Sequence, residues 1–379
     1  MITISTLCRR TVLTAAGTFL LLVVRAGTDY QQVNLVTDNN SIHPATIQDP
    51  NLVNAWGISD SGTSPFWVSD NGTGLSTLYR INPTTDFPTK VGLEVTIPGA
   101  GNPTGQAFNP LNGQGGAFNG DNFLFTSEDG TVSGWRGALG TTAEKLVLGS
   151  PDNVYKGTTI GTTAGGDAYL YSANFRAGTI DVLKGDASSP DITGKFLDPT
   201  LPAGFAPFNI RNLDGKLYVT YAVQDAAKHD DVAGAGNGFV DAYDLQGNFL
   251  GRVASQGTLD SPWGLEIAPS SFGTFAGDLL VGNFGDGTIS AFGLDGSGFK
   301  GQLPGTSGAP LSIDGLWALT VGNDSGAGSS SRLYFTAGPD GESHGLVGVL
   351  QGVPDGGSAL TLLMLSLTGL GLFSKRMRD

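Results

Sequence analysis

The sequence predicts an all-β protein whose strands form a six-bladed β-propeller. Glycine is frequent, with 59 in 379 residues, and only 14% of the residues are charged, which is typical of many short strands joined by tight turns. A strand–turn–strand pattern recurs six times. A short apolar segment precedes each of these pairs and a more variable strand follows it, so each unit has four strands.

The recurring pair consists of an apolar strand, a polar turn with glycine, and an alternating strand. Asp-Gly-Thr turns at 129–131 and 286–288 are strong hairpin signals, because glycine adopts a positive φ without steric cost. The pairs lie at residues 66–81, 123–135, 169–183, 217–245, 279–294 and 333–350, and the segments ahead of them at 55–59, 104–109, 155–161, 207–212, 262–269 and 316–322.

The last unit ends near Leu350 without a fourth strand, whereas residues 30–38 form an alternating strand that has no unit of its own. We predict that this leading strand of the mature protein is the outer strand of the last blade, which removes an open sheet edge. The competing architecture is a pair of β-sandwiches, which six matched units without a central linker fit poorly. The predicted propeller domain spans residues 27–352.

The two ends of the chain are read as targeting segments. Residues 1–26 have a basic pair, an apolar stretch and small residues, as in a signal peptide, and they hold the single cysteine. Residues 353–379 form the predicted sorting signal, with an uncharged stretch at 359–373 and a basic tip. As a membrane helix this stretch is about 22 Å long, short of a full span. The short motif before it comprises Val353, Pro354, Asp355, Gly356 and Gly357.

Charge excludes one class of partner. The residues between the two ends include 14 basic and 32 acidic side chains, a net charge of −18. Nucleic-acid binding needs clustered lysine and arginine, so we expect no nucleic-acid partner. An anionic surface suits a protein that works outside the cell, in the envelope or beyond it, where it stays soluble or binds cations.

The starts of the six inner segments align one side chain per blade around one mouth of the channel. Most of these side chains are aromatic, and flat rings stack well on sugars. We therefore predict a ligand-binding ring, with the alternative that the rings only plug the channel. The ring comprises Trp56, Thr104, Lys156, Phe208, Trp263 and Trp317.

A long insertion at 223–237 joins the second and third strands of the fourth unit. It should lie on the same face as the ring, because the inner strand begins where the antiparallel second strand ends. Its aspartates suit Ca²⁺, the candidate cofactor, and its histidine beside two carboxylates is a general-base candidate. The alternative is an acidic loop that is solvated or ordered by its own Asx turns. The candidates are Asp225, Lys228, His229, Asp230 and Asp231.

A weaker metal set consists of Asn54, Asn209 and Asp314, which lie on or next to inner strands. Carboxylate and amide oxygens at these places are the ligands that a cation in the channel would need. The three histidines of the chain share no metal-ligand spacing, so we expect no zinc site. No nucleophile elbow, P-loop or dinucleotide fingerprint occurs, so no catalytic residue is assigned.

The tail, with its short motif, apolar stretch and basic tip, resembles the PEP-CTERM sorting signals of bacteria in their VPDSG form. The body, through "NAWGI", "NPTGQAFN", "SPWGLEIAP" and "DGLWALTVGN", resembles a family of exported bacterial propeller proteins and, more distantly, NHL and lactonase-type propellers. The resemblance implies export and an exosortase-type enzyme as partner. Until that enzyme acts, the tail helix would hold the protein to the membrane. It implies no catalytic residue.

Three function classes remain. The first is an exported, surface- or matrix-associated propeller that presents a binding face to a glycan such as exopolysaccharide, to an envelope protein or to a small ligand. The second is a metal-dependent hydrolase of lactonase or esterase type with a cation in the channel. The third is a purely structural component of the envelope. We favour the first class.

Overall fold

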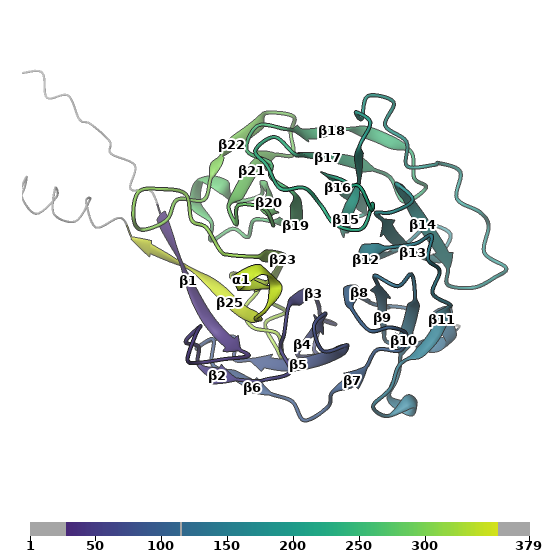
Figure 1. Cartoon of the computed structure of the whole chain (residues 1–379), viewed down its shortest axis with the longest axis horizontal. Coiled ribbons are helices and arrows are strands. Elements are labelled where there is room, and N and C mark those ends of the chain that lie inside the picture. Colours follow the sequence, from purple (N-terminus) through teal and green to yellow (C-terminus); the bar gives the residue numbers. More distant parts are fainter. Residues whose placement is uncertain (1–27, 114–115, 355–379) are drawn as a thin grey trace, which may run out of the picture. The chain divides into compact units, whose positions relative to one another are not determined.

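The computed structural model describes residues 28–113 and 116–354. In this part of the chain, six β-sheets are arranged radially around a central axis (Figure 1). The prediction of a six-bladed propeller is confirmed, and the pair of β-sandwiches is excluded. Each blade begins with its inner strand next to the axis and proceeds outward through antiparallel neighbours, and at the outer edge of the last blade one further pair is parallel.

The strands fall into the blades in chain order. Blade 1 comprises β3 (Ala55–Ser59), β4 (Phe66–Asp70), β5 (Leu75–Ile81), β6 (Pro88–Lys90) and β7 (Val95–Thr96); blade 2 comprises β8 (Pro103–Phe108), β9 (Phe123–Ser127), β10 (Val132–Trp135) and β11 (Glu144–Val147); blade 3 comprises β12 (Tyr155–Thr162), β13 (Ala168–Asn174) and β14 (Thr179–Lys184). Blade 4 comprises β15 (Phe205–Leu213), β16 (Lys216–Val223), β17 (Gly238–Tyr243) and β18 (Phe249–Ser255); blade 5 comprises β19 (Pro262–Ile267), β20 (Leu279–Asn283), β21 (Ile289–Gly293) and β22 (Gly298–Gln302). Blade 6 comprises β23 (Leu316–Val321), β24 (Leu333–Ala337), β25 (Leu346–Pro354), β1 (Thr28–Thr37) and β2 (Ile47–Gln48).

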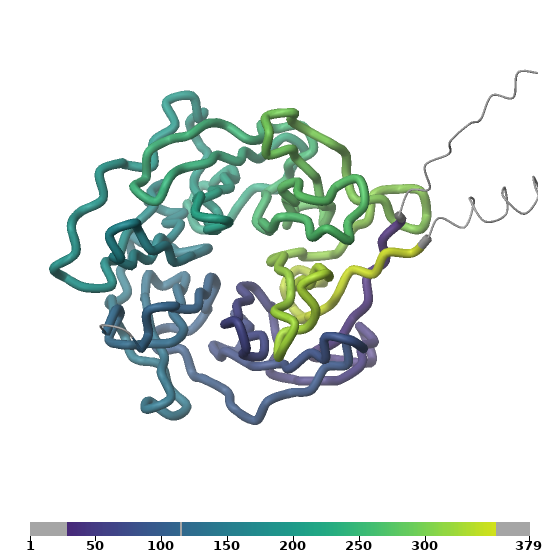
Figure 2. The backbone as a smooth tube through the Cα atoms, turned by 180° about the vertical axis from the view of Figure 1, so that it is seen from behind, coloured from purple at the N-terminus to yellow at the C-terminus, as the bar shows by residue number. Residues whose placement is uncertain are grey.

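The predicted ring closure is confirmed. Strand β1 pairs antiparallel with β25, and Val33 lies opposite Val349 in this register. The two strands run side by side at the edge of the ring, as Figure 2 shows from behind. Tyr30 and Val36 are buried, so β1 contributes to the core as well as to the ladder. Closure of this kind removes the open edge that a lone blade would expose.

Blade 3 departs from the expected four strands, because its sheet has three. The segment that follows β14 contains Pro190, Pro199 and Pro202 and forms no strand up to residue 204. Proline has no N–H to donate to a ladder, which disfavours a fourth strand here.

The hydrophobic core is layered between neighbouring blades. Trp67 of blade 1 stacks on Phe123 of blade 2 with ring centroids 4.2 Å apart, and similar buried clusters separate the following blades. One further cluster continues from the interface of blades 6 and 1 into the centre of the ring. The packing of each blade therefore depends on the next, and the central cluster joins blades 1, 3, 4, 5 and 6.

The predicted signal peptide (1–26) and the sorting signal from Asp355 onward lie outside the described residues. Val353 and Pro354, the first two residues of the short motif, end β25. Within residues 28–113 and 116–354, none of the helices has the length and apolar content to cross a membrane.

Candidate functional site

Six β-bulges direct one side chain from each inner strand toward the axis. In every blade the register between the first and second strands shifts at the predicted ring position, for example between Ala55 and Ile58 around Trp56. The same shift occurs at the other five positions. A bulge leaves one residue unpaired and re-aims its side chain, so the six ring residues are structurally equivalent.

Glycines let the inner strands approach one another closely beside this ring. A Cβ atom on Gly105 would lie 2.4 Å from the backbone nitrogen of Thr158, and one on Gly57 would lie 2.5 Å from the carbonyl oxygen of Thr104. No side chain fits at these distances, so only glycine is compatible with the spacing. The channel is therefore narrow at the level of the ring.

The aromatic ring residues fill this narrow channel. Trp56 stacks on Trp317 with centroids 3.6 Å apart, and Trp317 stacks on Phe284 at 3.9 Å. Trp263 meets both tryptophans edge-on. All six ring residues are at most 4% exposed, so a ligand cannot stack directly on the tryptophan faces. The alternative that these rings plug the channel describes their packing, and Phe284 is the partly exposed end of the stack.

A chain of hydrogen-bonded polar side chains lies at the mouth of the plugged channel. The Asn54 Nδ2 atom donates to Glu342 Oε2 at 2.6 Å and to Asn71 Oδ1 at 3.2 Å, and Asn71 Nδ2 donates to Glu128 Oε2 at 3.1 Å. The indole N–H of Trp317 donates to Asn54 Oδ1 at 3.0 Å, which links these polar side chains to the aromatic side chains that fill the channel.

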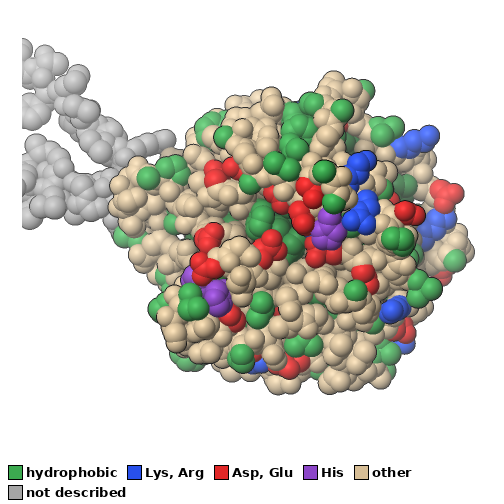
Figure 3. Space-filling model, in the orientation of Figure 1, with side chains coloured by type: hydrophobic (Ala, Val, Ile, Leu, Met, Phe, Trp, Pro, Cys, Tyr) green, Lys and Arg blue, Asp and Glu red, His purple; other side chains and the backbone are tan. Residues whose placement is uncertain are grey.

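Lys156 extends this series of hydrogen-bonded side chains to the inserted loop. Its ammonium group donates to Glu128 and, at 3.0 Å, to Asp230 Oδ1, which also lies 2.8 Å from His229 Nδ1. Figure 3 shows acidic and histidine side chains gathered around the centre of this face. We call these seven residues the axial network: Asn54, Asn71, Glu128, Lys156, His229, Asp230 and Glu342.

The network has unequal protonation preferences. Burial lowers the pKa of Lys156, but the carboxylates of Glu128 and Asp230 outweigh burial and leave the pKa raised. Burial raises the pKa of Asp230, but the Lys156 ammonium outweighs it and leaves that pKa lowered. For Glu342 burial dominates, so its pKa is raised. In the network, Glu342 therefore favours the protonated form and Asp230 favours the ionised form.

The inserted loop and the ring share one face, as predicted, because Asp230 of the loop contacts Lys156 of the ring. Asp225 orders the loop: its Oδ1 accepts from the backbone N–H groups of His229 and Asp230 at 2.8 and 3.3 Å. Lys228 is exposed with φ 55° at the turn, and burial raises the pKa of Asp231. The loop is thus ordered by hydrogen bonds from its own backbone to the Asp225 side chain, and it also delivers two side chains to the axis.

The weaker metal set does not assemble. Asn54 is bound to Glu342, whereas Asn209 Nδ2 donates to the Trp263 carbonyl at 2.7 Å and Asp314 Oδ2 accepts from the backbone of Asp340 at 2.8 Å. Each side chain is engaged by a different partner, so these residues form no common ligand shell.

Glu128, His229 and Asp230 do bring ligand atoms within 4.8 Å of one another. The Lys156 ammonium already bonds to both carboxylates, and a cation placed between them would face this fixed positive charge. These three residues therefore do not fit a Ca²⁺ site.

A groove opens beside the axial network, between blades 2 and 3. Its volume is about 630 Å³, and Glu128 and His229 form part of its lining. Lys145 and Arg176 line it as well, and neither takes part in an ion pair within the described residues. We call this cavity the side groove. It combines acidic groups, among them Asp129, with two cations that form no ion pair in the described chain.

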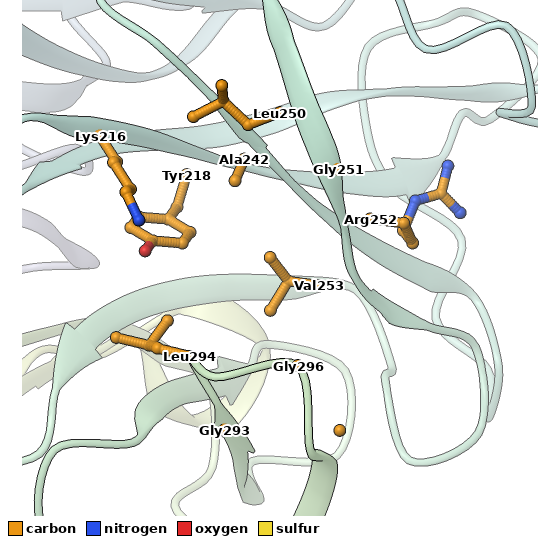
Figure 4. A pocket seen from close by; sticks show the side chains of 11 residues that line it. Lys216, Tyr218, Ala242, Leu250, Gly251, Arg252, Val253, Gly293, Leu294 and Gly296 are labelled. Carbon is orange, nitrogen blue, oxygen red and sulfur yellow. The ribbon is translucent and has the colours of Figure 1, made fainter.

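Two smaller cavities lie elsewhere. One of about 270 Å³ is lined by the distal ends of the inner strands, including Asp60 and Arg211. The other, of about 230 Å³, lies between blades 4 and 5, where Leu250, Val253 and Leu294 surround Tyr218 (Figure 4). The guanidinium of Arg252 points away from this second cavity, toward its partners Asp198 and Asp241.

Sequence reasoning missed four residues of the mouth: Asn71, Glu128, Phe284 and Glu342. Three of them share a signal, because Asn71, Glu128 and Phe284 each come directly after the second strand of their blade. Aligning that position across the units would have found them. Glu342 belongs to a turn that only blade 6 has, α1 (Pro339–Glu342), and it carries no repeat signal.

Comparison with known proteins places the chain among its relatives. Uncharacterized protein R648 of Acanthamoeba polyphaga mimivirus is 32% identical over 335 residues, which cover 84% of this chain and 79% of the relative. The chain belongs to the family of this protein. Uncharacterized protein L690 of the same virus, 31% identical over 84% of this chain and 85% of its own length, is a second member. Residues 352–377 of this chain match the VPDSG-CTERM motif, so the predicted C-terminal motif is confirmed.

Solved structures support the fold of this family. The α-L-arabinanase of Penicillium chrysogenum, in complex with arabinobiose, aligns with 85% of this chain and 97% of its own with a TM-score of 0.52 and 14% identity. An α-L-arabinofuranosidase of Fusarium graminearum aligns with 86% of this chain and 98% of its own, with a TM-score of 0.52 and 12% identity. At this identity the similarity concerns the fold alone.

Proposed function

We propose that this protein is an exported propeller that binds a glycan at the axial network and the side groove. The observation that carries the proposal is the bonded series of seven polar side chains at the channel mouth, two of which line a groove of about 630 Å³. Carboxylates, amides and an imidazole are the groups that hydrogen-bond to sugar hydroxyls. Phe284 offers a partly exposed ring for stacking.

Backbone strain at the network supports a functional role. Asn54 has φ 49° and Glu342 has φ 67°, and these two residues bond to each other. A left-handed conformation is uncommon for residues other than glycine, and glutamate lacks the tolerance that asparagine has for it. Strained residues cluster at functional sites, where the surrounding structure holds them.

Charge in the side groove favours a sugar that carries a carboxylate. Lys145 and Arg176 line the groove without an ion-pair partner in the described chain, although the region between the two predicted targeting segments has a net charge of −18. A polyanion would be repelled by most of this surface and attracted locally by these two cations. These two cations are therefore the proposed contacts of an acidic exopolysaccharide.

Export and sorting belong to the same proposal. The VPDSG-CTERM motif at 352–377 supports delivery to the cell surface. We propose that residues 1–26 direct export and that an exosortase-type enzyme recognises the tail. The propeller would then act in the envelope or outside the cell.

Retention on polysaccharide tests the binding function. The mature chain should migrate more slowly in native gels that contain an acidic polysaccharide such as alginate than in gels without it. Lys145→Gln should reduce this retardation about tenfold, because it removes one of the two cations that line the groove. Lys195→Gln is the matched control, since it removes an equal charge from an exposed lysine that does not line the groove.

Two outcomes would contradict binding at this site. One is equal retardation of the Lys145→Gln variant and the wild type. The other is no retardation of the wild type by acidic or neutral polysaccharides, which would favour a purely structural envelope component.

A second function, glycoside hydrolysis, is favoured by the opposite pKa shifts in the network. Hydrolysis of this kind uses one protonated and one ionised carboxyl, and Glu342 and Asp230 have the required preferences. The solved arabinanase was captured with arabinobiose. We propose this candidate in place of the metal-dependent hydrolase, because the Lys156 ammonium lies between the carboxylates where a metal cation would bind.

Product analysis separates hydrolysis from binding. If the protein is a hydrolase, wild-type protein incubated with α-arabinan should release new reducing ends, and Glu342→Gln should slow the release about 10²–10⁴-fold by removing the general acid. The Asp191→Asn variant should match the wild type. Retention of a polysaccharide without any new reducing ends would leave binding as the function.

A further inference from the structure

Two of the three histidines of the chain meet where the ring closes. His43 lies between β1 and β2, and His344 lies just before β25. Their ring centroids are 5.6 Å apart, with an angle of 67° between the planes. Their side chains are 23% and 18% exposed, so both are open to solutes.

Each imidazole is held by a carboxylate through one ring nitrogen. His43 Nε2 lies 2.9 Å from Asp340 Oδ2, and His344 Nδ1 lies 2.7 Å from Asp38 Oδ2. Asp38 is fixed in turn, because its Oδ1 accepts from the backbone N–H of Gly345 at 3.0 Å. A carboxylate on one nitrogen places the proton there, so the opposite nitrogen keeps its lone pair.

We propose that His43 and His344 together bind a divalent transition metal such as Zn²⁺, through His43 Nδ1 and His344 Nε2. Two imidazoles on one tetrahedral zinc, with Zn–N bonds of about 2.0–2.1 Å, have ring centroids roughly 5 Å apart. The observed 5.6 Å is close to this separation. Neutral imidazoles suit zinc, copper and nickel, and carboxylates behind metal-binding imidazoles commonly hold the rings in place.

The remaining ligands would be water, and nearby acidic groups favour a cation here. Asp38 and Asp340 contact the imidazoles directly, and Asp314 accepts a hydrogen bond from the backbone of Asp340. The metal would join the segment after β1 to the turn before β25. It would therefore clamp the closure of the ring, since a ligand that binds only the folded state stabilises that state. This inference does not depend on the proposed glycan site.

Metal titration of the untagged mature chain tests the proposal. Isothermal calorimetry should give one Zn²⁺ per chain, and added Zn²⁺ should raise the thermal midpoint of the wild type. His43→Ala and His344→Ala should each weaken binding at least tenfold and reduce the shift of the midpoint. His229→Ala, which removes the remaining histidine of the chain, should leave both unchanged.

A milder variant covers the case in which the alanine variants fail to fold. Asp340→Asn keeps both imidazoles but removes a carboxylate behind one of them, so it should weaken zinc binding about 10–100-fold. The proposal is overturned if 1 mM Zn²⁺ does not bind to the wild type, or if Asp340→Asn binds it as tightly as the wild type. Loss of binding in His229→Ala alone would also overturn it, because the metal would then lie at the axial network.

Discussion

Replacing Trp317 with alanine should lower the free energy of unfolding by about 3–5 kcal/mol, the range for a large aromatic side chain removed from a core. Trp317 is 1% exposed and contacts Trp56, Trp263 and Phe284 at the axis. Removing it would leave a cavity at the axis, between these aromatic side chains. It would also leave Asn54 Oδ1 without the donor that it has in the wild type. Urea denaturation followed by tryptophan fluorescence and circular dichroism measures the change.

Trp317→Phe is the matched control for this prediction. Phenylalanine keeps most of the stacking against Trp56 and Phe284 but loses the hydrogen bond to Asn54, so we expect a loss of about 1–2 kcal/mol. Equal stability of the alanine variant and the wild type would show that the aromatic plug does not hold the blades together. A loss in the phenylalanine variant as large as that in the alanine variant would show that the indole N–H matters more than the packing.

Replacing Lys156 with methionine should have the second largest effect, a loss of about 2–3 kcal/mol at neutral pH. The side chain is 2% exposed and bonds to Glu128 and Asp230. Methionine fills similar space but leaves these carboxylates beside each other without the ammonium group. The loss should be smaller than for a fully buried pair, because the Asp230 side chain is 65% exposed and water screens it.

The pH dependence of this variant should differ from that of the wild type. In the wild type, burial raises the pKa of Asp230, but the Lys156 ammonium outweighs burial and leaves this pKa lowered. The Asp230 carboxylate therefore stabilises the fold above its unfolded pKa of about 3.9. That contribution is lost as the pH falls through the lowered, folded-state pKa. Without Lys156 the cation that lowers the pKa of Asp230 is lost and the two carboxylates repel each other, so the fold binds more protons than the unfolded chain does.

The unfolding free energy of Lys156→Met should therefore fall more steeply than that of the wild type as the pH rises from about 4 to 7. Denaturation curves at several pH values measure this slope. Lys195→Met, which replaces a lysine that forms no ion pair within residues 28–113 and 116–354, should follow the wild type. Parallel slopes for Lys156→Met and the wild type would contradict the assigned role of the ammonium group.

Much of this architecture is determined by local sequence patterns. Six repeats of an apolar strand, a glycine turn and an alternating strand specify six blades, because alternation and turn chemistry act between residues that are close in the chain. The spare strand at 30–38 and the missing strand after Leu350 together predicted the closure by β1 and β25. The ring positions could be aligned from the sequence, because each lies at the start of its inner strand.

The tertiary structure alone decided what those positions do. Whether Trp56 and Trp317 face a ligand or one another depends on the narrow spacing of six inner strands, to which each repeat contributes only one side. Lys156 meets Glu128 and Asp230, and His43 meets His344, across distances in the chain that no motif spans. Local patterns report periodicity and turns, whereas the charge, burial and partners of a side chain depend on which blades closure of the ring brings together.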